Sequence, residues 1–154
     1  MSPGESKHGG DLPGSHGPVF DAFVRADGAQ QYREFVQTKG MVKEIKMKIK
    51  ACSSSVNSAK DRIDKLNAEI DSRKVSRIDT LTKSGLKPKE TEDIVDAEEF
   101  QLMKDVKEEK RTYKNAYEQL QRLRTDMAQV TGSADVAKTN FAEAFSRYQS
   151  QIAG

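Results

Sequence analysis

Apolar side chains recur along most of this chain at alternating intervals of three and four residues. The first series, which we call the first seam, runs through Val42, Ile45, Ile49, Cys52, Val56, Ala59, Ile63, Leu66 and Ile70. The second seam runs through Tyr113, Ala116, Leu120, Leu123, Met127, Val130, Ala134, Ala137, Phe141, Ala144 and Tyr148. This spacing is the heptad pattern of a long helix that buries one narrow stripe against another helix.

The two seams predict an all-α fold, with a first helix over about residues 29–75 and a second over about 93–150. The segment between them, about 76–92, contains a Ser-Gly pair and Pro88 and is expected to be a loop. Such a connection lets the helices fold back as an antiparallel helical hairpin, a coiled coil within one chain. A parallel dimer is the alternative, and the charges beside the seams do not decide between them. Gly132 is unfavourable within a helix, but the second seam keeps its 3-4 spacing across it. This favours a continuous helix over a break.

The N-terminal segment, residues 1–18, is rich in Gly and Pro and has almost nothing to bury. It is expected to be a disordered tail, and residues 19–154 to form the hairpin domain. Two histidines, His8 and His16, lie in this tail, where solvated side chains are favoured over a weak metal site. A short helical region is expected to begin near Val19 and to be interrupted at Asp27-Gly28.

The segment "DAEEFQLM", residues 96–103, joins three carboxylates to a run of apolar side chains. Carboxylates favour the positive end of a helix dipole, and Thr91, Asp93 or Asp96 can cap the free amides there. We therefore interpret the segment as a helix start rather than as a metal or catalytic cluster. Phe100, Met103 and Val106 are expected to supply the first inward turns of this helix.

Composition narrows the functional classes. Hydrophobic residues make up 35% and charged residues 32% of the chain, a balance typical of long solvated helices. A net charge of +2 does not suggest nucleic-acid binding, and no apolar run is long enough to span a membrane. One cysteine and no apolar leader fit the cytoplasm.

The motifs of common enzymes are missing from the sequence: there is no GxxxxGK[ST], no HExxH and no CxxC. Cys52 occupies a seam position and is interpreted as a small core residue rather than a nucleophile. The sequence therefore predicts a protein that is not an enzyme, with no catalytic residue, metal or cofactor.

Two stretches of the chain are rich in basic residues, although acidic and basic residues nearly balance over the whole chain. The first contains Lys43, Lys46, Lys48 and Lys50, and the second contains Lys104, Lys107, Lys110, Arg111 and Lys114. Both are compatible with solvated helix faces. The functional alternative is docking on an acidic surface, of which a tubulin lattice is one example.

The segment "IVDAEEFQLMKDVKEEKRTYKNAYEQLQRLRTDM" resembles the C-terminal helical region of the kinesin family nine proteins, the ciliary kinesins. That region has a similar acidic helix start followed by a Lys-x-x-Tyr-x-x-x-Tyr-x-x-Leu-x-x-Leu run, here Lys110, Tyr113, Tyr117, Leu120 and Leu123. The upstream helix with "AKDRID" is similar too, so the resemblance covers roughly residues 19 to 150. The motor domain and its phosphate-binding loop are not present, so this chain is either a fragment or a stand-alone protein built on the tail-like region.

The resemblance implies a structural component of the axonemal central apparatus of motile cilia or flagella, in the cytoskeleton. Its partners would be other helical axonemal proteins, with microtubules reached indirectly, and no nucleic acid or membrane. We expect the interface to use Tyr113, Tyr117, Leu120, Leu123, Phe141 and Tyr148, although the chain's own core is the alternative for the aromatic residues. The competing functions are a cytosolic coiled-coil adaptor and a direct microtubule-binding module.

Overall fold

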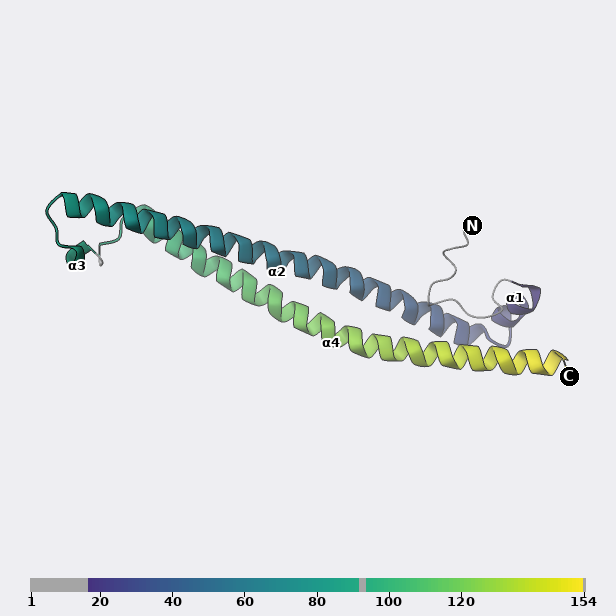
Figure 1. Cartoon of the computed structure of the whole chain (residues 1–154). Helices are drawn as coiled ribbons and strands as arrows, with labels where there is room; N and C mark the ends of the chain where they lie inside the picture. Colours follow the sequence, from purple (N-terminus) through teal and green to yellow (C-terminus); the bar gives the residue numbers. More distant parts are fainter. Residues whose placement is uncertain (1–16, 92–93, 154) are drawn as a thin grey trace. The chain divides into compact units, whose positions relative to one another are not determined.

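The computed structural model describes residues 17–91 and 94–153. Within these ranges the regular elements are all helices: α1 (Pro18–Arg25), α2 (Ala29–Lys83), α3 (Pro88–Thr91) and α4 (Ala97–Ala153) (Figure 1). The predicted tail and its two histidines lie outside the described residues except for Gly17 and Pro18. Pro18 is the first residue of α1, a position where its missing amide costs nothing.

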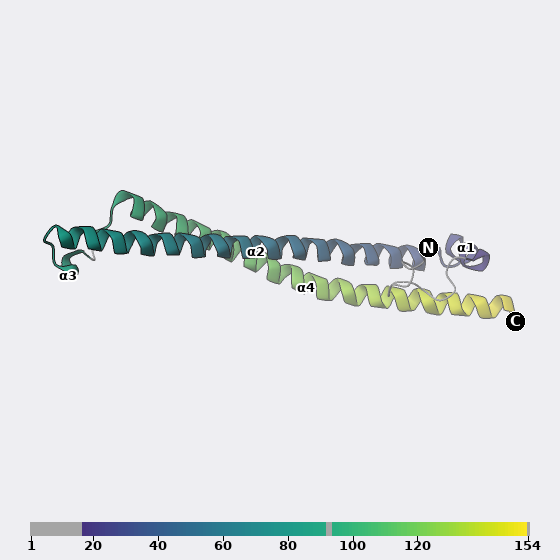
Figure 2. The same cartoon turned by 45° about the horizontal axis from the view of Figure 1, so that its top comes forward.

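The predicted helical hairpin is confirmed, because α2 and α4 pack against each other (Figure 1, Figure 2). Every residue of the first seam and of the second seam is buried or half-buried. The parallel dimer is therefore not needed to cover the seams. Gly132 lies within α4, which continues through it as predicted.

The hairpin consists of two units, each containing a segment of α2 beside a segment of α4. Unit 1 combines the described residues up to Lys48 with those from Leu123 onward, and unit 2 is Ile49–Arg122. Each unit has its own buried residues.

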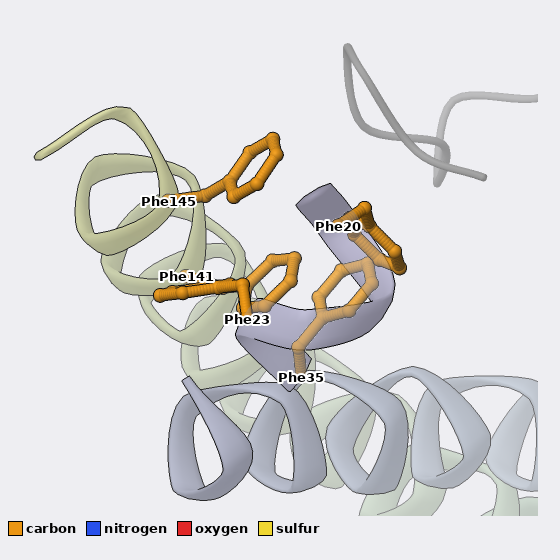
Figure 3. Packing of buried hydrophobic residues seen from close by; sticks show 5 residues of the cluster. All are labelled: Phe20, Phe23, Phe35, Phe141 and Phe145. Carbon is orange, nitrogen blue, oxygen red and sulfur yellow. The ribbon is translucent and has the colours of Figure 1, made fainter. Parts of the chain in front are cut away.

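Unit 1 contains an aromatic core to which three helices contribute. Phe20 and Phe23 come from α1, Phe35 from α2, and Phe141 and Phe145 from α4 (Figure 3). The ring centroids of Phe20 and Phe141 lie 5.9 Å apart in an edge-to-face arrangement, and those of Phe35 and Phe141 lie 5.8 Å apart and stacked. Both arrangements are favourable for aromatic pairs. Phe141 is fully buried at the centre of this core.

A close approach at Gly28 holds α1 in this position. The backbone amide of Gly28 donates a hydrogen bond to the carbonyl of Phe23 over 2.7 Å. A Cβ atom at Gly28 would come within 2.2 Å of the Phe23 ring. Because that ring is packed against Phe141 and Phe145, it has little room to move. Only glycine fits here without displacing the core.

In unit 2, α2 continues to Lys83, so the predicted end of the first helix near residue 75 is wrong. The seam also continues beyond Ile70, but its next positions are Arg73 and Arg77 instead of apolar residues. Gly85, two residues after the last residue of α2, has a φ of 101° and prevents the helix from continuing. Hydrogen bonds from Leu86 to Leu81 (3.2 Å) and from Gly85 to Thr82 (3.0 Å) close a Schellman motif there. The predicted loop at 76–92 is correspondingly shorter and includes α3.

The start of α4 confirms one part of the prediction and corrects another. Asp96 caps the helix: its Oδ1 accepts a hydrogen bond from the amide of Glu99 over 2.7 Å. The expectation that Phe100 and Met103 point inward is wrong, because they are 58% and 46% exposed. Counting back from Tyr113 in the seam phase gives Glu109, Val106, Leu102 and Glu99, and these are the residues that are buried or half-buried.

Candidate interaction surface

A buried ion pair closes the end of unit 2 that carries α3. The Arg77 Nε donates to Glu99 Oε1 over 2.8 Å, and its second terminal nitrogen donates to Glu99 Oε2 over 3.1 Å. A further guanidinium nitrogen donates to the carbonyl oxygen of Thr91. Glu99 is 2% exposed and Thr91 fully buried. This bidentate geometry satisfies a charge that would otherwise be costly in the interior, and so it disfavours other registers of α2 against α4.

The surroundings of Arg77 favour its protonated guanidinium. The hydrogen bond to Glu99, together with the charges of Glu99 and Asp96, outweighs burial and raises the pKa of Arg77 above its ordinary value. The resulting stabilisation is fully present below the ordinary pKa of arginine. It is lost only as the pH rises through the raised value, at strongly alkaline pH.

Two further ion pairs cross between the helices of unit 2 in the same sense. Arg73 lies 3.0 Å from Glu98, and Arg62 lies 2.9 Å from Glu109. In all three pairs the arginine comes from α2 and the glutamate from α4. These three pairs use arginines of α2 and glutamates of α4, so the lysines of α4 and the aspartates of α2 take no part in them.

The outward face of α4 in unit 2 is basic. We define the basic face as Phe100, Met103, Lys107, Lys110, Lys114 and Tyr117. These residues follow each other at intervals of three and four and are all exposed. Their lysines form no ion pair with another described residue, and Lys104 beside them lies 5.5 Å from the centroid of the Phe100 ring. The stripe is apolar and cationic, and its Tyr117 ring stacks on Tyr113 with the centroids 6.2 Å apart.

One stripe of exposed aspartates runs along α2 in unit 2, with exposed lysines beside it. We define the acidic face as Asp61, Asp64, Ala68, Asp71, Val75 and Ile78. Val75 is 69% exposed and Ile78 half-buried. Asp64 forms an ion pair with Lys60 at 3.3 Å, in which both side chains are more than half exposed, so the pair is weak. Neither Asp61 nor Asp71 forms an ion pair with another described residue.

The residues predicted as an interface lie in different environments. Leu120 and Phe141 are buried in the cores of unit 2 and unit 1, respectively. Tyr113, Leu123 and Tyr148 are half-buried, and Tyr117 is 46% exposed. Of the six, Tyr117 offers the largest exposed fraction for a partner. The acidic face was not predicted from the sequence, although its aspartates stand three and seven residues apart and one or two positions from the seam.

The structure also places Cys52 and allows a search for metal sites, membrane-spanning helices and grooves. Cys52 is buried, and its sulfur lies 3.2 Å from the carbonyl oxygen of Ala116. Residues 17–91 and 94–153 contain no group of three or more His, Cys, Asp or Glu placed to hold a metal ion. In the same residues, no helix is sufficiently long and apolar to cross a membrane. An open groove of about 340 Å³ beside Arg77 is lined by hydroxyl and cationic groups such as Ser76, Thr80 and Arg73.

These features define the class of the fold, an all-helical hairpin with outward charged and apolar faces. Residues 14–153 match the family described as the Kinesin-like protein KIF9 domain. The chain belongs to this family, as the resemblance predicted. Membership of this kinesin-like family associates the chain with the cytoskeleton.

A curated relative agrees with this assignment. The Kinesin-like protein KIF9 of Mus musculus is 28% identical over 115 residues, which cover 75% of this chain and 14% of the mouse protein. The chain thus corresponds to a small part of that relative. No solved structure matches the chain.

Proposed function

We propose that this protein is a non-enzymatic structural component of the axonemal central apparatus in motile cilia or flagella. It would pack its long helices against neighbouring helical projection proteins and so support motility. The family membership supports a cytoskeletal or ciliary setting. The observation that carries the assembly role is the pair of exposed faces in unit 2, which present apolar and charged side chains at helical spacing and take no part in the ion pairs between α2 and α4.

In this function the hairpin would be held in the axoneme by contacts between its exposed side chains and neighbouring proteins. Exposed apolar side chains at regular spacing are suited to packing against another helix. The ion pairs between Arg73 and Glu98 and between Arg77 and Glu99 fix the hairpin internally, so its outer faces keep a defined register. A rigid module of this kind loses little conformational entropy when it binds a neighbour.

The test is to locate a tagged copy in a flagellated cell and to extract the axonemes stepwise with detergent and then salt. The expected result is retention after detergent, and loss of the signal in cells that lack the central pair. The tag expressed alone is the control and should be released by detergent. A diffuse or vesicular signal would overturn the proposal in favour of the adaptor function. Retention in cells without the central pair would overturn the central-apparatus location.

A further inference from the structure

Unit 2 carries two stripes of opposite charge that the ion pairs between α2 and α4 leave unused. Of the aspartates on the acidic face, only Asp64 forms an ion pair with another described residue, the weak exposed one with Lys60. The arginines of α2 and the glutamates of α4 are paired across the hairpin, as with Arg62 and Glu109. The lysines of the basic face and the aspartates of the acidic face point away from that contact. We propose that the basic face of α4 docks antiparallel against the acidic face of α2 in a second copy of this chain.

The two faces share one register when the helices run in opposite directions. The intervals along the basic face, read forward, are 3, 4, 3, 4 and 3, and those along the acidic face, read backward, are the same. The facing pairs are then Phe100 with Ile78, Met103 with Val75, Lys107 with Asp71, Lys110 with Ala68, Lys114 with Asp64 and Tyr117 with Asp61. Apolar residues meet apolar residues at one end, and two of the three lysines meet aspartates in the middle.

The parallel alternative does not give this match. With the helices parallel, Phe100 faces Asp61 and Met103 faces Asp64, while Lys114 faces Val75. Both apolar side chains would then lose their apolar partners. Like charges or charge-to-apolar contacts are what exclude wrong registers in helix pairing. Charge complementarity therefore favours the antiparallel contact with a second copy.

Exposed charges dominate this contact, and this determines how it responds to salt. The Debye length falls from roughly 10 Å at 0.1 M salt to about 3 Å at 1 M, so exposed ion pairs weaken as salt rises. Self-association should accordingly weaken at high ionic strength. It would occur wherever the chain is found and is independent of the axonemal location proposed above.

The test measures the mass of the purified full chain by sedimentation equilibrium over a range of concentrations. We expect the mass to exceed that of one chain at about 50 mM salt, and the dissociation constant to rise at least roughly tenfold at about 500 mM. The triple variant Lys107→Glu/Lys110→Glu/Lys114→Glu should weaken association at least about tenfold, and Asp61→Lys/Asp64→Lys/Asp71→Lys should do the same.

Two controls separate this contact from general charge effects. The sixfold variant carrying both triple changes restores the +2 net charge of the chain and should associate like the wild type. The variant Lys43→Glu/Lys46→Glu/Lys48→Glu changes exposed lysines of unit 1 and should leave association unchanged. Circular dichroism confirms that each variant remains helical.

Three outcomes would overturn the contact: a single-chain mass throughout, association that ignores salt, or a sixfold variant that stays dissociated. If the wild type has a single-chain mass but cosediments with microtubules through Lys107, Lys110 and Lys114, the basic face belongs to tubulin instead. That result would leave the axonemal location standing, and a failed localisation would leave self-association standing.

Discussion

The two units are built from the same two helices, but they bury different chemistry. Unit 1 buries five phenylalanine rings, because α1 supplies a third helix and widens the core. Unit 2 has α2 and α4 without that third helix, and its seam buries smaller side chains such as Cys52, Val56 and Ala59. Its end is fixed by the ion pair of Arg77 and Glu99. The comparison indicates that unit 1 gains stability from buried area, whereas unit 2 gains a defined register from charge.

Removing a ring from unit 1 should have the largest effect. Phe141→Ala leaves a cavity where four other aromatic residues meet, and we expect a loss of about 4 kcal/mol of unfolding free energy. Urea unfolding measures the loss, and hydrogen exchange should show increased opening of α1. Met47→Ala, at a position of unit 1 that is 66% exposed, is the control and should change stability by at most about 0.5 kcal/mol. A loss for Phe141→Ala no larger than that of the control would contradict the role of the aromatic core.

Removing one partner of the ion pair should have a somewhat smaller effect in unit 2. Glu99→Ala leaves Arg77 buried without its carboxylate, and we expect a loss of about 3 kcal/mol. Hydrogen exchange should show increased opening of the first turns of α4. The double variant Arg77→Leu/Glu99→Leu should recover most of the loss, because apolar side chains of similar size can replace a buried pair. If the double variant is as unstable as Glu99→Ala, the pair contributes more than the neutralisation of charge.

The smallest effect on stability should come from changing the contact between Gly28 and the Phe23 ring of α1. Gly28→Ala should destabilise unit 1 by about 1–3 kcal/mol, because the new Cβ meets the Phe23 ring. The matched control is Gly132→Ala within α4, where nothing lies within 4 Å of the added Cβ atom. Because alanine favours a helix, this variant should gain up to about 1 kcal/mol. Thermal unfolding distinguishes the two, and equal shifts would show that α1 adjusts to the added methyl group.

The hairpin could be predicted from the sequence because both seams consist of apolar residues over most of their length. The sequence also predicted an acidic cap for the second helix, with Asp96 as one of three candidates, but it put the start near residue 93 instead of at Ala97. It misplaced the end of α2 because Arg73 and Arg77 continue the seam with charged side chains, and their burial depends on glutamates some 20 residues away. The true stop signal was Ser84-Gly85, a helix C-cap of the Schellman type.

The candidate surface was only half predicted. The lysines of the basic face were recognised as a charged stretch, but Phe100 and Met103 were assigned to the core. Their exposure follows from the phase of the second seam, which places Glu99 and Leu102 inward. The acidic face could not be interpreted without the structure, because aspartates on a helix surface gain meaning only when their internal partners are known.

The separation in sequence between buried partners sets an order of assembly. Arg77 and Glu99 are 22 positions apart, whereas Phe20 and Phe141 are about 120 apart. Loop-closure entropy rises with the logarithm of loop length, so the shorter contact costs about 1.5 kcal/mol less to close. During synthesis α1 leaves the ribosome long before Phe141 does. The aromatic core therefore cannot form until about 120 further residues have been made, and until then the rings of α1 remain without their α4 partners.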